Sequence, residues 1–222
     1  DSARLSIFGA SLAPCLAAAG LPIRWVIADD GSSEEDRAKL SGLRESFARI
    51  YPNVELHLAA MHHGKGSVIR EAWELAPDAD WLAFVDADGA VTADDMLGLI
   101  RQAIDAGQSV IGIRKRTDTT LLVESPWRGI AHRGFLLAAR WILGLHCEDP
   151  QCGAKVLRGE DYRRIAHRLV EDGLAFDSEL LATLSRDGST WREVPVNWTE
   201  KKGGKVKDSA PAGLADLALS KM

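Results

Sequence analysis

Short apolar runs alternate with helical segments through the first half of the sequence, and this alternation restricts the fold more than any other feature. The apolar runs that predict strands are Ile23–Ala28, Val54–Leu58, Trp81–Val85 and Ser109–Ile113. The segments that predict helices are about Glu34–Arg49, Gly64–Leu75 and Thr92–Asp105. This order predicts an α/β fold with a mostly parallel sheet and helices on both of its faces.

The composition is typical of a single globular domain over residues 1–222. Of the 222 residues, 46% are hydrophobic and 27% are charged, a balance at which a chain can bury one core. The net charge of −5 argues against a nucleic-acid partner, because proteins that bind nucleic acids usually carry an excess of basic residues.

Other features predict a cytoplasmic location. No apolar run is expected to span a membrane, and the polar start at Asp1–Arg4 is unlike a signal peptide. The three cysteines are odd in number and lack the spacing of a zinc site, which favours a reducing compartment.

Polar loops follow three of the predicted strands. They are Asp29–Ser32, His62–Gly66 and Asp86–Gly89. Because ligands of parallel sheets bind at the carboxyl ends of the strands, we expect the three loops to form one site. Each loop also has a simpler interpretation, as a turn or as the start of a helix. Gly64-Lys65-Gly66 is not a P-loop, because a glycine follows Lys65 where that motif has Ser or Thr.

Asp86 and Asp88 form the most specific pattern. Two carboxylates one residue apart at the end of a buried strand repel each other unless a cation neutralises them. Their hard oxygens suit Mg²⁺ or Mn²⁺, which also binds substrate phosphates. The alternative is a solvated turn in which an aspartate caps a helix.

Seven motifs, taken in order, carry a resemblance to a known family. They are Asp29–Ser32 (DDGS), His62–Gly66 (HHGKG), Asp86–Ala90 (DADGA), Asp149–Leu157 (DPQCGAKVL), Phe176–Leu181 (FDSELL), Arg192–Trp198 (REVPVNW) and Gly203–Val206 (GGKV). In this order they resemble the polyprenyl-phosphate sugar synthases of glycosyltransferase family 2, above all the dolichyl-phosphate glucosyltransferase branch. The resemblance covers about Arg4 to Val206 and implies the GT-A fold of nucleotide-diphospho-sugar transferases.

The resemblance implies a role for each matching position. The nucleotide of the donor would be contacted by Asp29, Asp30, Gly64, Lys65, Asp86, Ala87, Asp88 and Lys205. Within this set, Asp86 and Asp88 would hold the metal, and Lys205 would lie over the pyrophosphate. Arg114 and Arg128 would meet the phosphate of the acceptor, and Gln151 would belong to the acceptor loop.

The chemistry depends on the acceptor. A phosphate acceptor is largely dianionic at neutral pH, so it needs arginines such as Arg114 more than it needs a general base. A sugar hydroxyl would need a carboxylate base, for which Asp177 and Glu179 are the candidates. Alternatively, these two acids face water or cap the amphipathic helix that begins at Phe176. We expect Asp88, Arg114 and Asp177 to be the catalytic residues.

The segment from Arg114 to Arg140 is basic and carries large apolar residues such as Trp127 and Trp141. Such a segment is typical of an element that lies on a membrane surface. The alternative is a helix that faces the core and has a solvated basic side. We therefore expect peripheral contact with the cytoplasmic face of a membrane.

The sequence departs from the family pattern at its start. The family begins with a strand that ends in a Tyr-Asn-Glu-like turn, and this sequence begins just after that point. We interpret it as a fragment that lacks the first strand. The histidines before Gly64, together with Ala154 and Gly204, also replace the usual residues of the family.

The predicted function is an inverting transfer of a sugar, with glucose from UDP-glucose as the expected donor, to a polyprenyl or dolichyl phosphate. One alternative is a mannose synthase that uses GDP-mannose. A second is a soluble family 2 transferase with a sugar hydroxyl as acceptor. A sugar nucleotidyltransferase of the same fold and a non-catalytic nucleotide-sugar-binding module are further alternatives.

Overall fold

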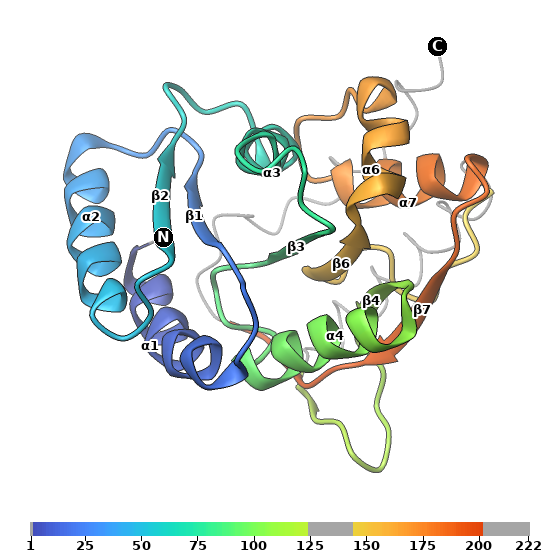
Figure 1. Cartoon of the computed structure of the whole chain (residues 1–222), viewed down its shortest axis with the longest axis horizontal. Coiled ribbons are helices and arrows are strands. Elements are labelled where there is room, and N and C mark those ends of the chain that lie inside the picture. Colours follow the sequence, from blue (N-terminus) through green and yellow to red (C-terminus); the bar gives the residue numbers. More distant parts are fainter. Residues whose placement is uncertain (1, 124–143, 202–222) are drawn as a thin grey trace.

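The computed structural model describes residues 2–123 and 144–201 (Figure 1). In chain order its elements are α1 (Ser2–Ala19), β1 (Trp25–Asp29), α2 (Glu34–Ala48), β2 (Val54–Leu58), α3 (Lys65–Glu74), β3 (Trp81–Val85), α4 (Ala93–Ala106), β4 (Ser109–Ile113), β5 (Leu122–Val123), β6 (Ala154–Arg158), α6 (Gly159–Ile165), the 3₁₀ turn η1 (Ala166–Arg168), α7 (Phe176–Arg186), β7 (Trp191–Pro195) and β8 (Trp198–Thr199).

The largest sheet has the strand order β3-β6-β4-β7. Strand β7 is parallel to β4, whereas β6 is antiparallel to both β3 and β4. The expected parallel direction therefore holds for β3, β4 and β7, and β6 is the exception. Strand β6 was not predicted, and its five residues include the charged Lys155 and Arg158.

Helices cover both faces of this sheet, as predicted. Neighbouring residues of β4 and β6 point to opposite faces, as they must in a pleated strand. Val110 and Val156 pack with α4, whereas Ile111 and Leu157 pack with α3, α6 and α7. In Figure 1, α3 and α6 accordingly lie above the central strands and α4 lies below them.

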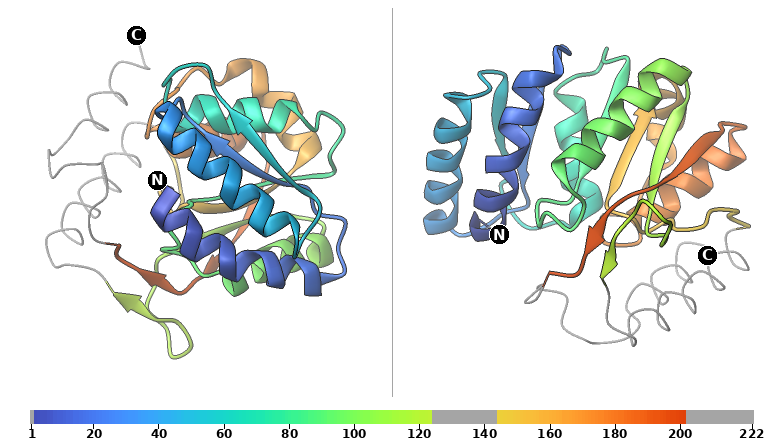
Figure 2. Two further views of the ribbon diagram at one scale, coloured as in Figure 1. Left: turned by 90° about the vertical axis from the view of Figure 1, so that its left-hand side faces the viewer. Right: turned by 90° about the horizontal axis from the view of Figure 1, so that it is seen from below.

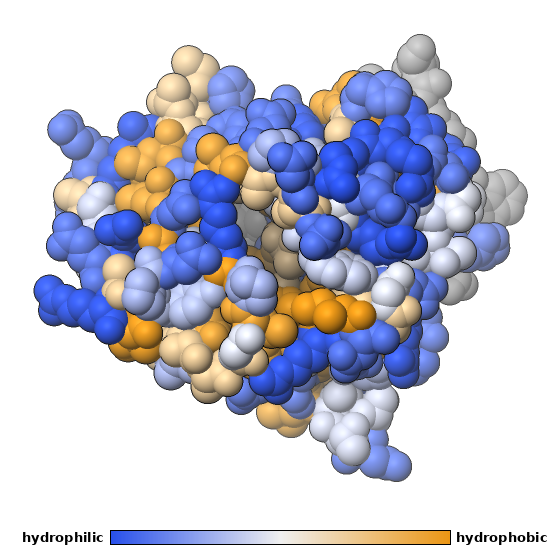
Figure 3. All heavy atoms as spheres, viewed as in Figure 1, coloured by the Kyte–Doolittle hydropathy of each residue, from blue (hydrophilic) through white to orange (hydrophobic). Residues whose placement is uncertain are grey.

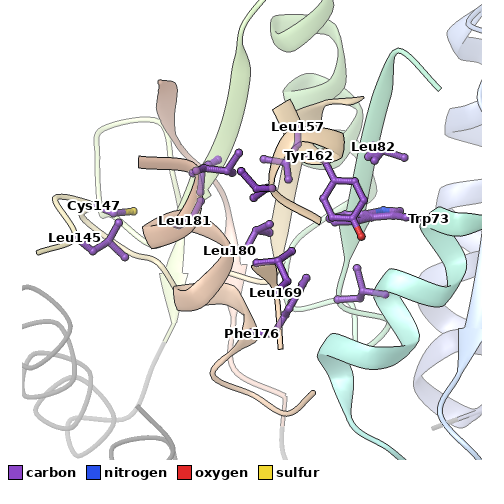
Figure 4. Packing of buried hydrophobic residues seen from close by; sticks show 14 residues of the cluster. Trp73, Leu82, Leu145, Cys147, Leu157, Tyr162, Leu169, Phe176, Leu180 and Leu181 are labelled. Atoms are coloured by element: carbon purple, nitrogen blue, oxygen red, sulfur yellow. The ribbon is translucent and has the colours of Figure 1, made fainter. Parts of the chain in front are cut away.

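The core on the side of α3 and α7 holds the end of β3 in place (Figure 4). The ring of Trp73 meets Tyr162 edge-on at 4.7 Å between centroids, and its indole nitrogen donates to the carbonyl of Ala83 at 3.2 Å. Phe176 and Leu180 are fully buried in the same cluster. This packing joins α3 and α7 to the strand that leads into Asp86.

The helix α1 was not predicted, because its first residues are polar and Pro14 lies inside it. It packs between α2 and α4, as the right-hand view of Figure 2 shows. Among the described residues α1 is the one helix long and apolar enough to cross a membrane by length and composition alone, which the sequence analysis did not anticipate. Leu5, Phe8 and Leu12 of this helix are buried against the domain, and 33% of the helix is buried in all.

Strands β1 and β2 form a parallel pair of their own. Within the described residues no strand pairs with both β1 and β3, and the face shown in Figure 3 is hollowed near the middle, between these strands. The helix α1 spans the same separation by contacting α2 and α4. That a further strand precedes α1 stays a prediction.

Three of the four predicted strands match the structure residue by residue: β2, β3 and β4. Strand β1 begins two residues later than expected, at Trp25. The predicted helix boundaries are right to within one residue for α2, α3 and α4. The caps explain this accuracy, since Ser33 and Thr92 accept backbone N–H groups at the starts of α2 and α4.

We expect Leu180→Ala to lower the free energy of unfolding by about 2–5 kcal/mol, because it leaves a cavity in a fully buried cluster. Leu174→Ala is the matched control, because Leu174 is 51% exposed, and it should cost less than about 0.5 kcal/mol. Urea denaturation of both variants measures the difference. Equal losses for the two variants would contradict the assignment of Leu180 to the core.

Candidate active site

The first two polar loops are joined through Asp30. One oxygen of its carboxylate accepts the backbone N–H of His63 at 2.9 Å, and the other accepts that of Gly64 at 3.0 Å. The ring of His62, which is mostly exposed, lies 2.6 Å from the same carboxylate. Asp30 therefore fixes the loop after β2 against the loop after β1.

Asp29 shapes the loop in which it lies. Its buried carboxylate accepts the backbone N–H of Ser32 at 3.0 Å, as an aspartate does in a turn. Gly31 has a φ of +70°, and a Cβ there would lie 2.3 Å from the backbone of Met61 and His62. The turn thus needs glycine at this position both for its conformation and for close contact with the second loop.

The second and third loops are joined through Lys65, the first residue of α3. Its ammonium lies 2.9 Å from Asp86 Oδ1 and 2.8 Å from Asp177 Oδ2. With the contacts of Asp30, this ion pair brings the three predicted loops together at one place. The expectation of a single cluster at the ends of β1, β2 and β3 is therefore confirmed.

The glycines beside Lys65 allow the chain to approach residues 171–173. Gly64 has a φ of +125°, and a Cβ there would lie 2.3 Å from the carbonyl oxygen of Asp172. The N–H of Gly66 donates to that same oxygen at 2.6 Å. The pattern therefore serves a close contact between two backbones, which agrees with the conclusion that it is not a P-loop.

Asp86 and Asp88 lie where β3 ends. The Asp86 side chain is 45% exposed, and its backbone N–H donates to the carbonyl of Gly153 at 2.8 Å. Asp88 Oδ1 accepts the N–H of Ala90 at 2.8 Å, and Ala87 between the two aspartates is exposed. The backbone of Asp86 is thus fixed by the residue before β6 and its carboxylate by Lys65, whereas the Asp88 carboxylate is held by the backbone of its own loop.

These two aspartates fit a divalent ion that takes its other ligands from phosphates and water. Mg²⁺ usually binds through one or two carboxylates plus substrate phosphates. Over residues 2–123 and 144–201, no three His, Cys, Asp or Glu side chains gather into a group that could hold a metal by itself. The donor set therefore suits an ion that arrives with a diphosphate.

Asp177, which we expected to be catalytic, has surroundings unsuited to a general base. Its side chain is 1% exposed and contacts the ammonium groups of Lys155 and Lys65. Burial raises the pKa of Asp177, but the two lysines more than offset this effect, so the pKa is lower than its ordinary value. A carboxylate held in its ionised form by two cations is a poor proton acceptor.

Glu179, the other candidate base, is also engaged. Its carboxylate accepts the backbone N–H groups of Val170 and Glu171 at 3.1 and 3.0 Å. The alternative that both acids face water is wrong for Asp177, which lies on the buried side of α7. Both side chains are therefore engaged in contacts within the protein.

Arg114 lies just after β4, in contact with the predicted acceptor loop. Its guanidinium donates to both oxygens of the buried Asp149, at 2.6 and 2.7 Å, and lies 5.5 Å from the ring centroid of Trp198. The amide of Gln151 donates to the hydroxyl of Ser178 at 2.9 Å. The loop that contains Asp149 and Gln151 is thus fixed between β4 and α7.

The remaining predicted residues, Arg128 and Lys205, lie outside the described residues. In the structure Cys15, Cys147 and Cys152 are free thiols. Burial, and then the nearby Asp149 carboxylate, raise the pKa of Cys152 to about 12. A thiol with such a pKa is inert at neutral pH.

Comparison with known proteins agrees with this geometry. Residues 7–154 match the model of a protein family described as glycosyl transferase family 2. The chain belongs to glycosyl transferase family 2. It is 28% identical over 195 residues to a dolichyl-phosphate beta-glucosyltransferase of Trichomonas vaginalis. It is 30% identical over 189 residues to the dolichyl-phosphate beta-glucosyltransferase of Dictyostelium discoideum.

These alignments cover 86% and 82% of this chain but only 58% and 56% of the two relatives. The chain therefore spans little more than half the length of the curated relatives that it matches. Among solved structures, glucosyl-3-phosphoglycerate synthase of Mycobacterium tuberculosis in complex with UDP superposes with a TM-score of 0.61 at 14% identity. This likeness covers 96% of our chain and 74% of that one, and it shows the GT-A fold.

Three residues that shape the site of this family 2 domain were not predicted: Asp149, Gly153 and Lys155. All three lie in the motif Asp149–Leu157, but the sequence of this motif does not indicate which residues they contact. A lysine inside the apolar run Ala154–Leu157 was the available signal, because a central strand buries a charge only together with a partner.

Gly153→Ala should displace the Asp86 carboxylate. A Cβ at position 153 would lie 1.9 Å from Asp86 Oδ2, so the carboxylate must move away from its place beside Lys65. We expect the affinity for UDP with Mn²⁺ to fall about 10-fold or more, as when groups that orient metal ligands are lost. Isothermal titration calorimetry with UDP and Mn²⁺ measures this affinity.

Gly98→Ala on α4 is the control, because a Cβ there meets nothing within 4 Å. This variant should bind like the wild type and gain up to about 1 kcal/mol of stability. Unchanged binding by a folded Gly153→Ala variant would contradict the role given to the contact between Gly153 and Asp86.

Proposed function

We propose that this chain carries the donor site of an inverting glycosyltransferase that moves glucose from UDP-glucose to a dolichyl or other polyprenyl phosphate. The names of the matched relatives support this choice of sugar and acceptor. The single observation that carries the proposal is the cluster at the end of β3, where Asp86 pairs with Lys65 and Asp88 follows in the same loop.

In this proposal Asp86 and Asp88 hold Mg²⁺ or Mn²⁺ together with the diphosphate of the donor. A bound divalent ion would neutralise the charge that develops on the leaving UDP. Lys65 adds a positive charge at the same place. Asp29 and Asp30 shape the loops that would face the base and the ribose, since their carboxylates accept backbone N–H groups there.

The contacts of the two candidate bases favour a phosphate acceptor over a sugar hydroxyl. Asp177 is paired with two lysines, and Glu179 accepts backbone N–H groups. A hydroxyl would need one of them to remove its proton, whereas a phosphate monoester is already largely dianionic at neutral pH. The acceptor phosphate would instead be oriented by arginines, of which Arg114 is preorganised by Asp149.

A polyprenyl phosphate is presented at a membrane, so the proposal includes peripheral contact with its cytoplasmic face. Residues 124–143, which include most of the basic segment and Arg128, lie outside the described residues. At the near edge of that segment, Leu121, just before β5, and Val123, on β5, are 58% and 46% exposed. Apolar side chains in such a place can enter the headgroup layer while nearby cations stay in water.

We expect Asp88→Asn to abolish Mn²⁺-dependent binding of UDP-glucose and sugar transfer while the fold stays intact. The amide removes one charge from the ligands of the metal, and a partly exposed position tolerates the substitution. Titration calorimetry and a transfer assay with polyprenyl phosphate measure the two effects. Asp78→Asn is the control, because Asp78 is an exposed carboxylate in the loop before β3. Near-normal activity of Asp88→Asn would rule out the metal assignment.

Arg114→Lys should raise the KM for the lipid phosphate and leave the affinity for UDP-glucose nearly unchanged. Lysine keeps the charge but cannot make the two parallel hydrogen bonds by which Asp149 fixes the guanidinium. Arg116→Lys, at an exposed neighbouring position, is the matched control. If Arg114→Lys transfers glucose to lipid phosphate as well as the wild type does, Arg114 has no part in acceptor binding.

A further inference from the structure

A lysine lies in the middle of the central sheet, where solvent does not reach it. Lys155 of β6 is in register with Phe84 of β3 and with Ile111 of β4, and its side chain is fully buried. Its ammonium donates to Asp177 Oδ1 at 2.5 Å and to the carbonyl of Cys152 at 2.6 Å. Both hydrogen bonds are needed, because a buried ammonium without partners is strongly unfavourable.

This ion pair continues as a row of charges that ends at the candidate active site. Asp177 accepts from Lys65 with its second oxygen, and the ammonium of Lys65 also lies 2.9 Å from Asp86 Oδ1. The order from the core outward is Lys155, Asp177, Lys65 and Asp86. The two ammonium groups lie 5.2 and 5.1 Å from the ring centroid of Phe84. Positive and negative charges alternate along the row and balance.

Stability alone is a weak reason for such a row. Removing two charges from water is unfavourable, and apolar side chains of similar volume often replace a buried ion pair without loss of stability. The row does, however, restrict Lys65, whose long side chain could otherwise turn toward solvent. Asp177 holds its ammonium, and Lys155 supplies the second positive charge that keeps Asp177 ionised inside the protein.

We infer that Lys155 and Asp177 are positioning residues, which hold Lys65 and through it the Asp86 carboxylate at the place where the nucleotide diphosphate binds. This inference rests on the proposed function and deepens it. The pair acts through Lys65 and Asp86, and we expect its loss to free these two side chains to adopt other rotamers. Donor affinity then falls even though the chain stays folded.

The test uses the double variant Lys155→Met/Asp177→Leu, which removes both buried charges together and leaves neither one unpaired. Its melting temperature should lie close to that of the wild type, because apolar side chains of similar volume often replace a buried ion pair without loss of stability. Calorimetric titration of UDP with Mn²⁺, without acceptor, should show a Kd raised about 10-fold or more. The KM for the donor should rise more than kcat falls.

Asp187→Asn is the control. Asp187 pairs with Arg164 and Arg168 at the opposite end of α7, so this variant breaks ion pairs of the same helix away from the site. Its Kd for UDP with Mn²⁺ should equal that of the wild type. If the double variant does not fold, Lys155→Met/Asp177→Asn, which also removes both charges but keeps the size of the Asp177 side chain, takes its place with the same expected rise in Kd.

The outcomes separate this inference from the proposed function. A folded variant that binds UDP and Mn²⁺ as tightly as the wild type would show that the pair is structural only and would overturn the positioning role. If the wild-type chain itself binds no UDP in the presence of Mn²⁺, the proposed function fails and the positioning role fails with it.

Discussion

The ion pair between Lys65 and Asp86 joins the start of α3 to the end of β3, and the candidate site is arranged around it. Lys65 follows the loop that Asp30 holds against the loop after β1. Asp86 follows the strand that Trp73 and its neighbours fix from the core. Strands β1 and β2 form a sheet of their own, and these contacts join the loops after them to the end of β3 in one connected cluster.

The antiparallel strand β6 and the loop that leads into it supply further residues that contact this cluster. Because β6 lies between β3 and β4, it brings Gly153 against the Asp86 carboxylate and Lys155 into the core beneath it. The loop that leads into β6 holds Asp149, which fixes Arg114 at the end of β4. One strand from a distant part of the sequence therefore reaches both the proposed donor side and the proposed acceptor side of the site.

The strands β2, β3 and β4 and the gathering of the three loops could be predicted, because continuous apolar runs and polar loop residues are local signals. The helix α1 could not be predicted, because its polar first turn and Pro14 are not typical of a helix. The error over Asp177 has a different origin. Asp177 precedes Leu180 and Leu181 by three and four residues, so helical spacing places it on their buried side. Its lysine partners lie far away in sequence, and only the fold shows that they meet it.

Calorimetric titration of UDP-glucose and of GDP-mannose, each with and without Mn²⁺, tests the central claim most directly. The claim is that the end of β3 is a metal-dependent site for a UDP-sugar. We expect UDP-glucose to bind only when Mn²⁺ is present, and more tightly than GDP-mannose does. Binding of UDP-glucose that does not depend on the metal, or tighter binding of GDP-mannose, would contradict the account.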